Sequence, residues 1–261
     1  MKEMKDIKRI VVKVGSSTIT RETGLNLRKL DQLAMVLSDI KNKGIDVILV
    51  SSGAVSAGAA KLKLKERPDT MKEKQAAASV GQCELMFLYD KFFSQYGQIV
   101  SQLLITKADT TNDTRRENAI NTLDTLLQHG VIPIINENDS IAVDEIAYGD
   151  NDTLSAVSAH LVQADLLVLL TDIDGLYDKN PTEHLDACLI EVVDVIDEHI
   201  LAMAEDTSSK VGTGGMITKL HAAMFANEHH IPMIIASGEH PAILYNILEN
   251  DYRGTLFDVK E

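Results

Sequence analysis

Short runs of aliphatic and β-branched residues alternate along the chain with segments whose apolar positions recur at helical spacing. The runs predict strands at Ile10–Val14, Asp46–Val50, Ile99–Ile105, Val131–Ile135, Leu166–Leu170 and Ile231–Ala236. The second of these, Asp46–Val50, is a continuous apolar run of the kind that is typical of parallel strands buried on both faces. Pro133 counts against a central position for the fourth strand, because proline cannot donate a ladder hydrogen bond.

Helical periodicity fills the segments between these runs. Helices are predicted over 27–40, 72–96, 113–129, 154–161, 214–228 and 241–249, with another beginning in the small-residue stretch after the second strand. Gly44 and Gly130 are expected to end two of them, and Asn112 or Asp113 to cap one. This alternation predicts an α/β fold, a three-layer αβα sandwich with a mainly parallel central sheet. We expect residues 1–261 to form one domain, with Lys61–Lys74 as its best candidate for a mobile surface loop.

Composition excludes several classes of protein. The formal net charge is −14, and no cluster of lysine and arginine suggests a nucleic-acid surface. The N-terminus lacks the apolar core of a signal peptide, and the longest apolar run is too short to span a membrane, so a cytoplasmic protein is expected. Cys83 and Cys188 are expected to pack as small apolar residues in a reducing compartment.

Candidate chemistry lies where the predicted strands end, because ligands of such sheets bind beyond the carboxyl ends of the strands. Lys13, followed by Gly15 and Ser16, would hold a phosphate through its charge and through backbone N–H groups, or would simply be solvated. Ser52 and Gly53 open a stretch of small residues, which suits either close approach of a ligand or tight helix packing.

Two polar segments lie between the fourth predicted strand and the helix that follows it. Asn136 and Asp139 come first, then Asp150, Asn151 and Asp152. Carboxylates and amides suit the ammonium and carboxylate groups of an amino acid, although Asn and Asp also form turns and cap helices.

A glycine-rich segment, Gly212–Lys219, opens the helix predicted over 214–228 and is a plausible phosphate cradle. It does not have the Walker A order, and no GxGxxG follows the first strand, which disfavours a dinucleotide-binding domain. The eight histidines have no metal-binding spacing and are interpreted as surface or core residues.

The order of the motifs KVGSS, VSSGAVSAG, INENDSIA, GDND, LLTDIDGLYDKNP and GTGGMITK resembles the amino acid kinase family, in the form that its glutamate 5-kinases use. The resemblance runs from the first strand to the C-terminal GTLFD. It implies ATP-dependent phosphorylation of the γ-carboxylate of L-glutamate, the first step of proline biosynthesis. We expect the ATP phosphates to hold the Mg²⁺ ion. A carboxylate is already ionised at neutral pH, which agrees with the lack of a general-base motif.

The resemblance also implies a role for each candidate residue. Lys13 and Lys219 would flank the transferring phosphoryl group, and Asp152 would orient them. The residues implied to bind glutamate are Ser52, Gly53, Asn136, Asp139, Asp150 and Asn151. Those implied to bind ATP are Lys13, Gly15, Ser16, Thr171, Asp172, Thr213, Gly214, Gly215, Met216, Ile217, Thr218 and Lys219.

Further expectations follow from the same resemblance. L-proline would be a feedback inhibitor, glutamyl phosphate reductase a partner, and the chain a homo-oligomer without the PUA-type C-terminal domain that many members carry. Two alternatives remain: another family member acting on N-acetylglutamate, aspartate, carbamate or a nucleoside monophosphate, and a non-catalytic amino-acid-sensing domain. ATP dependence separates the second from a kinase.

Overall fold

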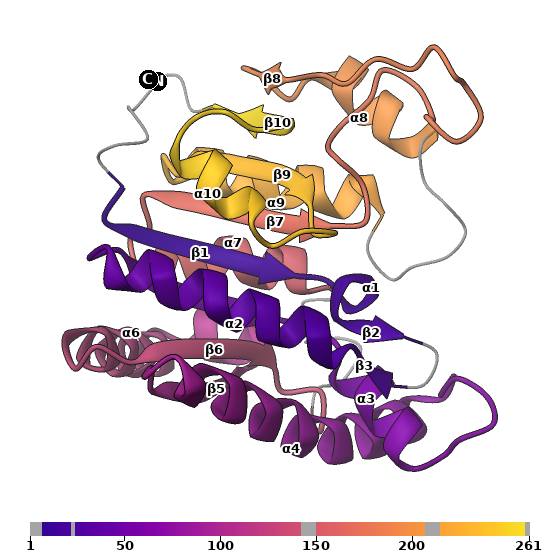
Figure 1. Ribbon diagram of the computed structural model, residues 1–261. Coiled ribbons are helices and arrows are strands. Elements are labelled where there is room, and N and C mark those ends of the chain that lie inside the picture. The colour runs from indigo at the N-terminus through magenta and orange to yellow at the C-terminus, as the bar shows by residue number, and fades with distance from the viewer. Residues whose placement is uncertain (1–6, 22–23, 142–149, 207–214, 259–261) are drawn as a thin grey trace.

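The computed structural model describes residues 7–21, 24–141, 150–206 and 215–258. They form an eight-stranded sheet in the order β5-β6-β4-β1-β7-β9-β10-β8 and a separate small hairpin, β2–β3 (Figure 1). The strands of the sheet are β1 (Arg9–Val14), β4 (Asp46–Ser51), β5 (Val100–Ile105), β6 (Ile132–Glu137), β7 (Leu166–Thr171), β8 (Val192–Val193), β9 (Met233–Ser237) and β10 (Gly254–Phe257). The hairpin pairs β2 (Thr20–Arg21) with β3 (Gly24–Leu25).

Six neighbouring strands, from β5 to β9 in the sheet order, run parallel. Beyond them β10 pairs antiparallel with β9, and β8 pairs parallel with β10. The prediction of a mainly parallel sheet is therefore confirmed. β1 lies at its centre, where Lys13 is in register with Val50 of β4 and Leu169 of β7.

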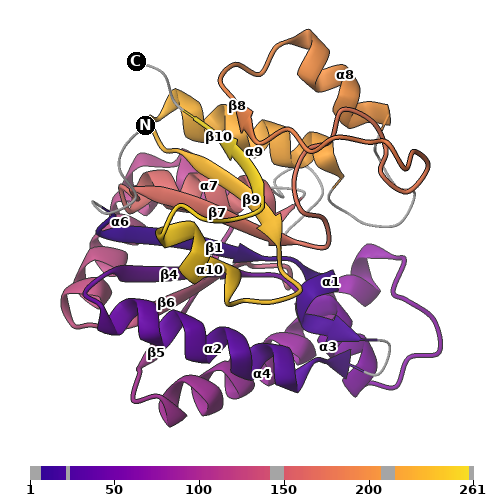
Figure 2. The ribbon, with the colours of Figure 1, turned by 45° about the horizontal axis from the view of Figure 1, so that its top comes forward.

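The helices cover both faces of the sheet (Figure 2). They are α1 (Ser16–Ile19), α2 (Leu27–Asn42), α3 (Ala54–Lys61), α4 (Met71–Gln95), α5 (Lys107–Thr111), α6 (Asp113–Gln128), α7 (Asn151–Leu161), α8 (Glu198–Asp206), α9 (Met216–Glu228) and α10 (Ile243–Leu248). Among the described residues, none of these helices is long and apolar enough to cross a membrane.

Alternate side chains of each central strand point into two separate cores. Val12 of β1 belongs to the core under α2, α4 and α10, whereas the adjacent Val11 belongs to the core under α6, α7 and α9. This alternation is what a strand buried on both faces requires. The three-layer αβα architecture predicted from the sequence is confirmed.

Helix ends follow the predicted polar and glycine signals. Asn112 caps α6, because its side-chain oxygen accepts a hydrogen bond from the N–H of Arg115 at 3.1 Å. Gly44 and Gly130, just beyond α2 and α6, have φ angles of +88° and +70°, which side-chain-bearing residues rarely adopt.

Three expectations differ from the structure. Pro133 lies in an internal strand, since β6 pairs with β5 on one side and β4 on the other. The pairing with β4 begins only at Ile134, so the missing N–H of Pro133 interrupts no bond on that side. Cys83 and Cys188 are both exposed rather than packed in the core. The loop expected at 61–74 is shorter, because α3 ends at Lys61 and α4 begins at Met71.

Candidate active site

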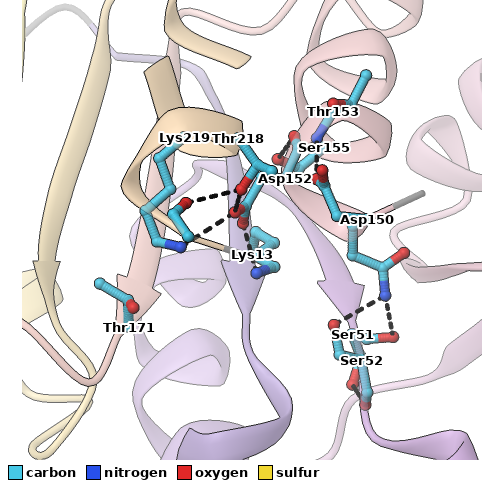
Figure 3. A network of polar contacts seen from close by, with 12 residues as sticks. Lys13, Ser51, Ser52, Asp150, Asp152, Thr153, Ser155, Thr171, Thr218 and Lys219 are labelled. Carbon is cyan, nitrogen blue, oxygen red and sulfur yellow. Dashed lines mark hydrogen bonds and ion pairs between the residues drawn. The ribbon is translucent and has the colours of Figure 1, made fainter. Parts of the chain in front are cut away.

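Four parallel strands, β1, β4, β6 and β7, end at the same edge of the sheet, and α7 and α9 begin at that edge. Lys13 comes from the end of β1, Asp152 from the first turn of α7 and Lys219 from the first turn of α9. Figure 3 shows both lysine side chains directed at Asp152. Residues from three separate parts of the chain therefore meet at one point.

Asp152 holds the two lysines in a buried ion-pair network. Its Oδ1 lies 2.5 Å from Lys13 Nζ, and its Oδ2 lies 3.1 Å from Lys219 Nζ. The hydroxyl of Thr218 donates a further hydrogen bond to Oδ2 at 3.1 Å. The three charged residues are at most 7 % exposed. Burial alone would raise the pKa of Asp152, but the two ammonium groups outweigh burial and hold that pKa below its ordinary value.

A second group of predicted residues is joined through the Asn151 amide. Asn151 Nδ2 donates to Ser52 Oγ at 2.8 Å and to Asn136 Oδ1 at 2.9 Å. Asn151 Oδ1 is buried and accepts no hydrogen bond from any described residue. Gly53 precedes α3 with a φ of +101°, a conformation that suits glycine. Ser52, Asn136 and Asn151 therefore form a polar cluster, in which the Asn151 Oδ1 is available to accept a hydrogen bond from a ligand.

Two carboxyl groups among the predicted glutamate contacts have raised pKa values. Burial raises the pKa of Asp139, which follows β6, to about 6. Burial, and then the charge of Asp152, raise the pKa of Asp150. Asp150 also caps α7, because its Oδ1 accepts a hydrogen bond from the N–H of Thr153 at 2.9 Å. The capping interpretation and the binding interpretation of Asp150 are thus compatible.

The residues implied to bind ATP lie at the ends of β1, β7 and the start of α9. The N–H of Gly15 donates to the carbonyl of Leu170 at 3.4 Å, which holds the β1 and β7 ends together, and Ser16 opens the short helix α1. Thr171 donates its hydroxyl hydrogen to Asp172 at 2.9 Å.

At α9, Gly215 is the N-terminal cap, so the backbone N–H groups of Met216 and Ile217 begin the helix beside Lys219. Helix N-termini of this kind attract anions. Thr213 and Gly214 lie outside the described residues.

Sequence reasoning missed two side chains of α4 that support this site. Gln82 Oε1 accepts a hydrogen bond from Asn136 Nδ2 at 3.0 Å, and the Tyr89 hydroxyl lies 2.7 Å from Ser51 Oγ. Burial raises the pKa of Tyr89, so its hydroxyl stays protonated. No local motif marks either residue, because each reaches the site from a helix distant in sequence.

Within the described ranges, no group of three or more His, Cys, Asp or Glu side chains is placed to hold an ion. Both oxygens of Asp152 face lysine ammonium groups. Two ammonium groups beside one carboxylate suit an anionic ligand.

Comparison with known proteins identifies the family. Residues 8–237 match the model of the amino acid kinase family. Glutamate 5-kinase of Clostridium acetobutylicum is 53 % identical over 257 residues, which cover 98 % of this chain and 96 % of that protein. Glutamate 5-kinase of Clostridium perfringens is 49 % identical over 265 residues, covering 100 % and 98 % of the two chains.

Solved structures agree on the fold at much lower identity. Carbamate kinase from Giardia lamblia bound to AMP-PNP superposes with a TM-score of 0.67 at 17 % identity, covering 98 % of this chain and 100 % of that one. UMP kinase from Ureaplasma parvum gives 0.66 at 15 % identity, covering 97 % and 99 %. With its buried lysine–aspartate–lysine network and these relatives, the chain belongs to the amino acid kinase family, among the glutamate 5-kinases.

Proposed function

We propose that the chain transfers the γ-phosphoryl group of ATP to the γ-carboxylate of L-glutamate. The observation that carries this proposal is the buried network of Lys13, Asp152 and Lys219 at the carboxyl edge of the sheet. Two ammonium groups and one carboxylate give this network a net positive charge, although the chain as a whole is strongly negative. An anionic nucleophile and an anionic nucleotide require such local compensation.

The reaction needs positioning and charge neutralisation rather than a base. An oxygen of the ionised γ-carboxylate attacks the γ-phosphorus, a new P–O bond forms, and the bond to the β,γ-bridging oxygen breaks to release ADP. No proton is transferred, because the attacking carboxylate is already deprotonated at neutral pH. Lys13 and Lys219 would stabilise charge on the phosphoryl oxygens, and Asp152 would keep both ammonium groups in place.

Glutamate would bind on the β4–β6 side of this network. The unsatisfied Oδ1 of Asn151 would accept a hydrogen bond from the substrate ammonium group. Asp139 and Asp150 would ionise on pairing with that ammonium, since an opposite charge nearby lowers a carboxyl pKa. Ser52, Gly53 and Asn136 would complete the glutamate contacts.

ATP would enter with its Mg²⁺ as one substrate complex. Gly15, Ser16 and the α9 N-terminus would contact the phosphates, and Thr171 and Asp172 would hold the nucleotide beside them. In this division the first part of one domain, residues 1–261, binds glutamate and the last part binds ATP. Use of ATP fits a cytoplasmic location.

The test is ADP release with Mg-ATP across a panel of amino acids, with hydroxylamine present to trap an acyl phosphate as the hydroxamate. Glutamate-dependent release with hydroxamate formation is expected, with N-acetylglutamate and aspartate inactive. Turnover of a different acceptor would contradict the assignment of the two acidic loops, and glutamate binding without ADP release would favour a sensor.

The chemistry of the product suggests the partners. An acyl phosphate hydrolyses readily in water, so an enzyme that reduces it, a glutamyl phosphate reductase, would act directly after this one. L-proline, as the expected end product, would inhibit at the same or a linked site, and the chain would act as a homo-oligomer. Titration of turnover with proline and light scattering of the free protein test these two points.

A further inference from the structure

A cavity of about 420 Å³ lies outside the proposed active site, between α5, α6, α7 and the end of α9. Its lining includes Lys107, Arg116, His160, Phe225 and His229, and it shares no side chain with the proposed glutamate and ATP contacts. A volume of this size lies within the range of small-molecule sites.

The lining is basic although the chain carries a net charge of −14. Lys107, Arg116, His160 and His229 all contribute, and no described lining residue is acidic. Arg116 pairs with Asp113 at 2.6 Å, but that aspartate side chain is 88 % exposed and its attraction is therefore screened by water. Burial, and then the charges of His229 and Arg116, lower the pKa of His160, as expected where positive charge gathers.

Aromatic rings form one side of the same cavity. The rings of Phe225 and His229 are stacked with centroids 4.4 Å apart, and the His160 ring lies 3.9 Å from that of His229. His229 Nδ1 lies 2.8 Å from the carbonyl oxygen of Phe225. Because a carbonyl only accepts, Nδ1 donates this hydrogen bond.

We propose that this cavity is a second ligand site, which binds a small organic anion carrying a flat ring. Nucleoside monophosphates and aromatic carboxylates share this chemistry. The anionic group would pair with Lys107 and Arg116, and the ring would pack against Phe225 and the two histidines. Charge and ring are recognised by different residues, so their contributions can be separated by experiment.

The position of the cavity connects it to catalysis. α7 carries Asp152 in its first turn and His160 in its last, and α9 carries Lys219 in its first turn and Phe225 in its last. The cavity also reaches Thr153, the residue after Asp152, so a ligand in it would contact both the helix that carries Asp152 and the helix that carries Lys219.

The first probe is phenyl phosphate, measured by calorimetry on the full chain. Inorganic phosphate supplies the charge without the ring, and benzyl alcohol supplies a ring without the charge. Arg116→Gln and Lys107→Gln remove the proposed anion contacts, and Phe225→Leu removes the ring. Arg115→Gln is the matched control, because Arg115 directly precedes Arg116 on α6 and pairs with Asp109 rather than lining the cavity.

We expect phenyl phosphate to bind more tightly than either fragment. Its affinity should fall about tenfold or more in Arg116→Gln and Lys107→Gln and stay unchanged in Arg115→Gln. Phe225→Leu should weaken phenyl phosphate but not inorganic phosphate. UMP and AMP, compared with benzoate, then distinguish the two ligand classes.

Two results would overturn the proposal. One is the absence of binding by every ring-bearing anion. The other is binding that survives both cavity charge variants, which would locate the anion at the lysines of the active site. Neither result depends on turnover, so the proposed kinase activity is tested separately.

Discussion

Replacement of Asp152 by asparagine removes the carboxylate that faces both active-site lysines. With an effective dielectric constant of about 20, the attractions at 2.5 Å and 3.1 Å correspond to about 7 and about 5 kcal/mol before desolvation is counted. Desolvation cancels much of this, and removal of one partner from a buried ion pair costs about 3–5 kcal/mol. Asparagine still accepts one hydrogen bond, so we expect Asp152→Asn to lower the free energy of unfolding by about 3 kcal/mol.

The assay is urea unfolding at pH 7, with and without Mg-ATP. Asp152 has a lowered pKa in the folded protein, so its contribution is complete above about pH 4, the ordinary carboxyl range, and is lost as the pH falls through the folded pKa. A measurement at pH 7 therefore includes all of it. Phosphates should partly replace the missing charge, so Mg-ATP should stabilise the variant more than the parent protein.

Asp46→Asn is the matched control. Asp46 pairs with Arg9 at 3.1 Å, but both side chains are partly exposed, so its loss should cost no more than about 1 kcal/mol. Turnover of Asp152→Asn should fall about 100-fold, because the two ammonium groups then repel each other without a fixed partner. Unfolding within about 1 kcal/mol of the parent, together with near-normal turnover, would refute the proposed role of Asp152.

Three other substitutions test separate parts of the structure. Lys219→Met should reduce kcat by ~10²–10³-fold in the hydroxamate assay while the fold persists by circular dichroism, and near-normal kinetics would exclude a phosphoryl contact. Asp139→Asn should raise the KM for glutamate but stabilise the protein by up to roughly 3 kcal/mol at pH 7. The pKa of Asp139 in the folded protein, about 6, exceeds its ordinary value, so the parent protein loses stability as the pH rises from about 4 to 6 and this carboxyl ionises. Urea unfolding should show this gain disappearing below about pH 4, and a constant gain at all pH values would contradict it. Gly58→Ala should destabilise by more than about 2 kcal/mol in thermal melts, because the added Cβ would lie 1.7 Å from a backbone oxygen of α4, whereas Gly97→Ala, with open space around it, should cost only about 1 kcal/mol for its positive φ.

Local pattern was sufficient for the long elements. The continuous apolar run of β7 and the helical spacing of α2 predicted the ends of both elements within two residues. A strand buried on both faces is apolar at every position, whereas a helix buried on one face repeats its apolar positions every three to four residues. Asn112 and Gly44 predicted helix ends for the same local reason. Short elements such as β8, of two residues, carry too few positions for a period and were not predicted.

The amino-acid sequence by itself determined the layered fold, the motifs that resemble the amino acid kinases, and thereby the charged residues of the site. Only the tertiary structure decided that Pro133 lies in an internal strand, that Cys83 faces solvent and that Gln82 supports Asn136. It alone brought Arg116 and Phe225 to one cavity. The physical reason is common to all four: each depends on contacts between elements distant in sequence, and no local period or cap encodes which elements become neighbours.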